Sequence, residues 1–92
     1  MKIIMNLKMN KIYLITTEGC LGCEIMEKNI LKVISKYKDW SLGVYDFKIM
    51  PKELLNLDIT DFPATVFIKN NNIHSYYIGS LTKDRIDYII NN

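Results

Sequence analysis

Residues 16–24 read TTEGCLGCE, and the two cysteines in this stretch, Cys20 and Cys23, are the only ones in the chain. The stretch follows KIYLIT (residues 11–16), a run of β-branched and aromatic residues that predicts a buried strand. After Cys20 the apolar residues recur at spacings of three and four, which predicts a helix over residues 21–37 with one apolar face. The cysteine pair is therefore predicted at the junction between a strand and a helix.

The rest of the chain continues to alternate between short elements. Its residue patterns predict, in chain order, a strand at 40–47, a short helix at 51–56, strands at 64–69 and 73–78, and a last helix at 82–91. Pro51 is well placed to open the short helix, the asparagines at 70–72 suit a tight turn, and Thr82 can cap the last helix. The third and fourth strands are therefore predicted to form a hairpin.

The predicted order of elements, β-α-β-α-β-β-α, indicates an α/β fold. A strand-helix-strand opening implies a parallel pair joined by a crossover, and the closing hairpin adds antiparallel strands. We therefore expect one domain over residues 11–92, with a mixed, four-stranded central sheet and helices on both faces. Residues 1–10 are expected to form either a loose tail or an extra edge strand.

Composition and charge limit the kinds of partner. With 49% hydrophobic and 24% charged residues, the chain resembles a folded globule rather than a disordered segment. Its net charge of +2 is too small to indicate a nucleic-acid or membrane partner. The N-terminal MKIIMNLKMN interrupts its apolar run with asparagine and lysine, unlike a signal peptide. We therefore expect a cytoplasmic protein, in a compartment where lasting structural disulfides are rare.

The cysteine pair could serve metal binding, packing or redox chemistry. Structural zinc takes four ligands, almost always cysteine or histidine. The chain has two cysteines and one histidine, His74, which lies far away on a predicted strand, so a metal site would need carboxylates or a second chain. No bound metal is therefore expected. As small buried hydrophobes the cysteines would only fill space in the core, and this alternative stays open.

A helix N-terminus suits redox chemistry at the pair. Its free N–H groups and partial positive charge favour a thiolate over a thiol, which predicts a lowered pKa for Cys20. The spacing also brings the two sulfurs within bonding reach. Cys20 is thus predicted to attack a substrate disulfide and Cys23 to resolve the mixed disulfide, while Gly19 and Gly22 keep the approach to the sulfur open.

Three segments together resemble the thioredoxin superfamily over residues 11–92: CLGC (20–23), DFPATVFIKNNN (61–72) and IGSLTKDRI (78–86). The resemblance implies a thioredoxin-like fold in which Pro63 is a cis-proline opening the third strand, although local rules also permit a trans-proline there. Phe62 would offer its backbone to an extended substrate by strand addition. The implied substrate-binding residues are Gly19, Leu21, Gly22, Phe62, Pro63 and Gly79.

The chain also departs from the pattern that thioredoxins usually show. Tryptophan, a Gly-Pro pair, a buried aspartate and a basic residue are usual at the positions held here by Gly19, Leu21-Gly22, Leu14 and Glu24. Without the aspartate, protons would move through water or through Glu18. Glu18 also fits an ordinary solvated loop carboxylate.

The resemblance implies a dithiol-disulfide oxidoreductase of the electron-carrier type. We expect a small, monomeric protein disulfide reductase with no tightly bound cofactor, regenerated by a thioredoxin reductase or by glutathione. Two alternatives are a glutathione-dependent, glutaredoxin-like protein and a redox-inert binding module of the same fold. The segment IGSLTKD is closer to the thioredoxin type than to the Gly-Gly-Asp pattern of glutaredoxins, and no basic cluster flanks the cysteines to hold glutathione carboxylates. Protein disulfides are therefore the expected substrates.

Overall fold

The computed structural model describes residues 10–92. Its elements are, in chain order, β1 (Asn10–Thr16), α1 (Leu21–Ile34), β2 (Trp40–Asp46), the 3-10 helices η1 (Phe47–Ile49) and η2 (Lys52–Leu54), β3 (Ala64–Lys69), β4 (Asn72–Ile78) and α2 (Lys83–Asn91). The tail or edge strand expected at residues 1–10 lies outside the described residues, apart from Asn10, which begins β1. Across residues 10–92, neither helix combines the length and the apolar character needed to cross a membrane.

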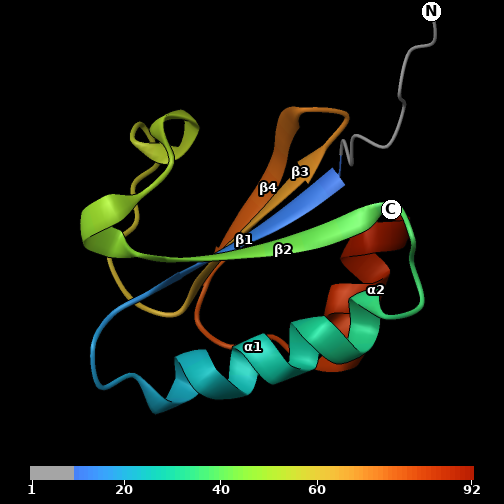
Figure 1. The fold of residues 1–92 in the computed structure, drawn as a ribbon, viewed down its shortest axis with the longest axis horizontal. Coiled ribbons are helices and arrows are strands. Elements are labelled where there is room, and N and C mark those ends of the chain that lie inside the picture. The colour runs from blue at the N-terminus through green and yellow to red at the C-terminus, as the bar shows by residue number, and fades with distance from the viewer. Residues whose placement is uncertain (1–9) are drawn as a thin grey trace, which may run out of the picture.

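The four strands form one mixed sheet in the order β2-β1-β3-β4 (Figure 1). β1 and β2 run parallel and are joined through α1, whereas β3 is antiparallel to both β1 and β4. Asn70 and Asn71 make the turn between β3 and β4, with φ angles of 52° and 66° in the left-handed region that asparagine tolerates. The predicted α/β fold with a mixed, four-stranded sheet is confirmed.

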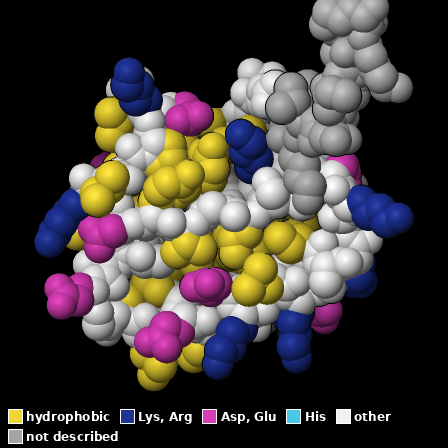
Figure 2. All heavy atoms as spheres, viewed as in Figure 1, with side chains coloured by type: hydrophobic (Ala, Val, Ile, Leu, Met, Phe, Trp, Pro, Cys, Tyr) yellow, Lys and Arg dark blue, Asp and Glu magenta, His cyan; other side chains and the backbone are white. Residues whose placement is uncertain are grey.

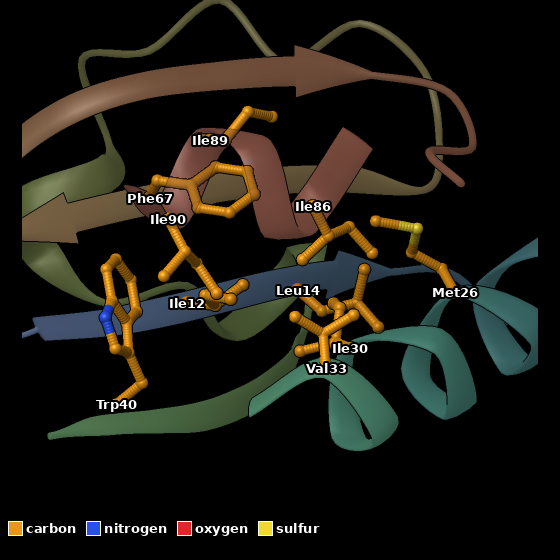
Figure 3. Close-up of a cluster of buried hydrophobic side chains, with 10 residues drawn as sticks. All are labelled: Ile12, Leu14, Met26, Ile30, Val33, Trp40, Phe67, Ile86, Ile89 and Ile90. Carbon is orange, nitrogen blue, oxygen red and sulfur yellow. The ribbon is translucent and has the colours of Figure 1, made fainter. Parts of the chain in front are cut away.

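Both α-helices cover the same face of the sheet (Figure 1). Together with that face they enclose a cluster of buried side chains, shown in Figure 3: Ile12, Leu14, Met26, Ile30, Val33, Trp40, Phe67, Ile86, Ile89 and Ile90. The apolar face predicted for α1 is present, with Met26, Ile30 and Val33 buried. The cap predicted for α2 is present too, since the Arg85 N–H donates to Thr82 Oγ1 at 3.1 Å. Removing these side chains from water supplies the main driving force that holds α1 and α2 on the sheet.

Helix α1 is shorter than its apolar pattern predicts. It ends at Ile34, three residues before Tyr37. Ser35 stands at its C-cap and its Oγ donates to the Lys32 carbonyl at 2.7 Å, a local bond of the kind by which serine competes with continued helix. Tyr37 is therefore outside the helix and reaches α2, where its hydroxyl donates to Asp87.

The opposite face of the sheet is covered by the irregular segment 47–62, not by an α-helix. Its inward side chains and that face form a second buried cluster, with Leu54 fully buried. The helix expected at 51–56 is a single 3-10 turn, Lys52–Leu54, that follows Pro51. The prediction of an α-helix was wrong here because the segment offers one deeply buried apolar side chain, too few to stabilise so short a helix against its nucleation cost.

Candidate active site

One edge of the sheet carries the C-terminal ends of β1, β2 and β4 together with the N-terminal end of β3. This follows because β3 runs antiparallel to β1 and β4, and β2 runs parallel to β1. The loops at this edge contain the cysteine pair, Phe47, the Phe62-Pro63 peptide and Gly79. The topology therefore gathers segments that are up to about sixty residues apart in the sequence.

Cys20 lies at the N-cap of α1. It has an extended backbone, with φ −94° and ψ 98°, and its Sγ accepts a hydrogen bond from the Cys23 N–H at 3.0 Å. The same N–H also donates to the Cys20 carbonyl at 3.2 Å. A backbone donor and the positive end of the helix dipole therefore face the Cys20 sulfur, and both stabilise a thiolate more than a thiol.

The two cysteines form a disulfide and differ in exposure. Their Cα atoms are 5.2 Å apart. Cys23 is only 4% exposed, on the inner side of the first turn of α1, whereas Cys20 is partly exposed. A large substrate approaching from solvent can therefore reach Cys20 far more readily than Cys23.

The Phe62-Pro63 peptide bond is cis, as the resemblance implied. Pro63 is buried beside the first turn of α1, since a Cβ placed on Gly22 would lie 3.5 Å from Pro63 Cδ and 3.7 Å from Ser80 Oγ. The Pro63 carbonyl accepts a hydrogen bond from the Gly79 N–H at 2.8 Å. Gly79 has a φ of 99°, a conformation that favours glycine. The structure thus brings together the predicted site residues Gly22, Pro63 and Gly79.

The remaining predicted residues line the same edge. Gly19 turns the chain into the site with a φ of 73°, and its α-carbon faces open space. Leu21 is 69% exposed, although it directly follows Cys20. Phe62 is half-buried, and its backbone N–H donates to Asp61 Oδ1 at 2.8 Å. One of the backbone groups expected to pair with a substrate is therefore held by the chain's own carboxylate.

Sequence analysis missed three residues that shape the site. Phe47 packs its ring against that of Phe62, with centroids 5.2 Å apart, and remains 41% exposed. From α1, Met26 Sδ accepts a hydrogen bond from the Leu81 N–H, and Asn29 Nδ2 donates to the Leu81 carbonyl at 3.3 Å. These pairs are separated by 15 to 55 positions, and neither the hydrophobic pattern nor the spacing of the residues signals contacts at such range.

The strand before the cysteines carries no buried carboxylate at position 14. Leu14, which stands where thioredoxins usually carry an aspartate, is fully buried in the core between the sheet and the helices. Its partner across the strands, Thr65, is buried with a hydroxyl that makes no hydrogen bond within residues 10–92. Glu18 is exposed. In the described part of the chain, no group of three or more His, Cys, Asp or Glu side chains is arranged to hold a metal ion.

Comparison with known proteins identifies the architecture. No protein-family model matches the sequence, and neither does any curated protein. Among solved structures, oxidised mitochondrial thioredoxin 3 from Saccharomyces cerevisiae matches with a TM-score of 0.76 at 18% identity, over 95% of this chain and 82% of that one. The chain has the thioredoxin fold. Two further thioredoxins agree with this assignment.

Chloroplastic thioredoxin z matches with a TM-score of 0.75 at 17% identity, over 91% of this chain and 77% of its own. Malaria parasite thioredoxin-2, a component of protein secretion machinery, matches with a TM-score of 0.75 at 13% identity, over 89% and 81% of the two chains. At these identities the likeness establishes the thioredoxin fold alone.

Proposed function

We propose that the protein is a thiol-disulfide oxidoreductase, a small thioredoxin-like reductase of protein disulfides. The observation that carries the proposal is the unequal pair: a partly exposed Cys20 at a helix N-cap, bonded to a Cys23 that is 4% exposed. A purely structural disulfide needs neither the exposure of one sulfur nor a backbone donor aimed at it. The thioredoxin fold also supports this function, because here it places the cysteine pair at the start of α1, beside the buried Pro63.

In the proposed cycle, the reduced protein begins with a Cys20 thiolate. Its sulfur attacks one sulfur of the substrate disulfide, so that the substrate S–S bond breaks, a Cys20–substrate disulfide forms, and the first substrate thiolate leaves and takes a proton from water, which had received the proton of Cys20. The Cys23 thiol then loses its proton and attacks the Cys20 sulfur. The mixed disulfide breaks, the Cys20–Cys23 disulfide forms, and the second substrate thiol is released. Two electrons and two protons have passed to the substrate.

Regeneration needs two electrons and two protons from a donor. Either a thioredoxin reductase or two molecules of glutathione can supply them by the reverse exchange, with no bound cofactor on this chain. We place the cycle in the cytoplasm, where the glutathione and thioredoxin systems keep accessible dithiols reduced, and we propose that the protein acts as a monomer. Exposed Glu18 and Glu24 flank the cysteines and disfavour the approach of anionic glutathione, which favours protein disulfides as substrates and a reductase over glutathione as the donor.

Reduction of the insulin disulfides, with dithiothreitol as the donor, tests the proposal. We expect turnover by the wild-type protein and only background turnover by Cys20→Ser and Cys23→Ser. Equal turnover by all three proteins would contradict the function and favour a redox-inert binding module of the same fold.

A further inference from the structure

The edge that carries the cysteines is acidic, although the whole chain is not. The net charge of the chain is +2. In the loop segments that meet at this edge, residues 16–24, 46–48, 61–63 and 79–81, four carboxylates accompany a single lysine, Lys48. Figure 2 shows acidic side chains, with hydrophobic ones between them, at the end of the molecule where α1 begins. An approaching substrate therefore meets negative charge and apolar surface together.

The carboxylates at this edge have different roles. Asp46 Oδ1 accepts a hydrogen bond from the Lys48 N–H at 2.9 Å and so stabilises the turn after β2. Glu18 and Glu24 are exposed beside the two cysteines. Asp61 is also exposed, and its carboxylate occupies the Phe62 N–H, next to the cis-proline. Asp61 is thus the carboxylate that is bonded to the backbone N–H beside the cis-proline.

We propose that the site selects disulfides whose cysteine is flanked by lysine or arginine, and that Asp61 is the residue that determines this specificity. The inference rests on the proposed reductase function. A basic side chain of the substrate pairs with the Asp61 carboxylate and draws it from the Phe62 N–H. That N–H then donates to a backbone carbonyl of the extended substrate, as in strand addition. One hydrogen bond of Phe62 replaces another, so the exchange leaves no buried donor unpaired.

The apolar part of the edge fits the same substrate. The rings of Phe47 and Phe62, which pack against each other at a tilt, lie beside Asp61, and Leu21 lies beside Cys20. Such surface accepts the aliphatic stem of lysine or arginine while the charged head reaches a carboxylate. An acidic substrate would instead meet like charges and would leave the Asp61 carboxylate on the Phe62 N–H.

Three disulfide-bridged peptides test the proposal, alike except that lysine, serine or glutamate flanks each cysteine. The second-order rate of peptide reduction by the reduced protein is measured by chromatography at 0.05 M and 0.5 M salt. We expect the lysine peptide to react roughly fivefold or more faster than the glutamate peptide at low salt, and the ratio to approach one at high salt because salt screens exposed charges.

Substitutions at Asp61 separate its charge from its hydrogen bond. Asp61→Asn keeps an acceptor for the Phe62 N–H and removes the charge, so the ratio of lysine to glutamate rates should fall by roughly two- to fivefold. Asp61→Ala also frees the N–H, so the serine peptide should react faster than with the wild-type protein. The matched control is Asp39→Asn, at the opposite edge of the sheet beside Asn10, which should leave all three rates unchanged.

The outcomes distinguish the selectivity proposed for Asp61 from the reductase function on which it rests. Reduction of all three peptides at one rate, or a ratio that Asp61→Asn does not change, overturns the inference and leaves the reductase function in place. Reduction of none of the peptides by the dithiol protein overturns both.

Discussion

The two ends of α1 are held by different kinds of contact. At its N-terminal end the helix meets loops where Gly22 lies against Pro63 and Ser80. Its own Cys23 N–H donates to the sulfur of the N-cap residue Cys20. At its C-terminal end, side chains two and three residues beyond the last helical residue join it to α2. The Tyr37 hydroxyl donates to Asp87, the Asn91 amide donates to that hydroxyl at 2.9 Å, and Lys36 pairs with Asp87 at 3.4 Å.

The difference separates function from stability within one helix. The N-terminal end leaves a sulfur accessible and surrounds it with backbone groups and small residues, which suits a substrate that must approach closely. The C-terminal end uses side-chain hydrogen bonds and an ion pair to fix α1 on α2. We therefore expect changes at the first end to alter disulfide exchange, and changes at the second end to alter mainly the stability of the fold.

The largest effect on disulfide exchange should come from replacing the two cysteines one at a time. With Cys23→Ser, attack by Cys20 still occurs but nothing resolves the product, so a stable mixed disulfide with a peptide substrate should accumulate. With Cys20→Ser, the remaining thiol is buried and almost no adduct should form within the same time. Mass spectrometry of the two variants measures the adduct. Equal adduct on both, or more on Cys20→Ser, would show that the roles of the two sulfurs are reversed.

The second largest effect should come from a large side chain at position 22. The available space of 3.5 to 3.7 Å around a Gly22 Cβ accommodates a methyl group but not a longer side chain. Gly22→Leu should displace Pro63 or Ser80, cost roughly 1–3 kcal/mol of unfolding free energy and lower the rate of disulfide reduction. The matched control Gly22→Ala should fold and gain up to about 1 kcal/mol from helix propensity. Urea unfolding and peptide reduction measure the two effects, and wild-type behaviour of Gly22→Leu would refute this packing.

At the other end of α1, the pH dependence of stability should change without a change in redox activity. The hydrogen bond from Tyr37 is the main cause that lowers the pKa of Asp87, and Lys36 adds to it while partial burial opposes it. Because the folded-state pKa lies below the unfolded one, Asp87 stabilises the fold above its unfolded pKa of about 3.9, and this contribution is lost as the pH falls through the folded value.

Asp87→Asn should therefore flatten the loss of stability between about pH 5 and pH 3. Tyr37→Phe should flatten it too, because it removes the main stabilising donor. Both variants should reduce peptides at the wild-type rate at pH 7. If both variants keep the wild-type dependence of stability on pH, the contacts of Asp87 do not stabilise the fold as proposed. If either variant reduces peptides more slowly, the two ends of α1 do not serve stability and activity separately.

The smallest effect should come from the middle of α1. Asn29 donates to the Leu81 carbonyl and so links α1 to the segment after β4. Asn29→Ala should lower the unfolding free energy by only about 0.5 kcal/mol, because the better helix propensity of alanine offsets part of a hydrogen bond worth roughly 1 kcal/mol. Chemical denaturation checks this value. A loss above about 2 kcal/mol would mean that this link carries more of the stability than the account assigns to it.

The features that depend on neighbouring residues in the chain could be predicted from the sequence. The strand Ala64–Lys69, the Asn70-Asn71 turn and the Thr82 cap depend on residues near them in the chain, and all three are found as predicted. The junction of strand and helix around Cys20 is likewise a local feature. The cis state of Pro63 followed from resemblance, since local rules permit both isomers.

The features that were not predicted have both local and tertiary causes. The length of α1 depends on a local bond from Ser35 to the Lys32 carbonyl, which competes with the apolar pattern. The short turn at Lys52–Leu54 depends on how little of the segment the sheet can bury. The contact between the rings of Phe47 and Phe62 requires the end of β2 and the start of β3 to meet at one edge. No pattern along the chain carries that information.

The reduction potential of the Cys20–Cys23 couple decides whether the pair exchanges with substrates or only holds the fold together. The protein is equilibrated with dithiothreitol or glutathione redox buffers, and the fraction of disulfide is measured by thiol alkylation and mass. We predict a reversible two-electron transition between about −270 and −120 mV, the range of known exchange proteins with this kind of dithiol. A couple that stays oxidised below about −300 mV would identify a structural disulfide and would contradict the proposed function.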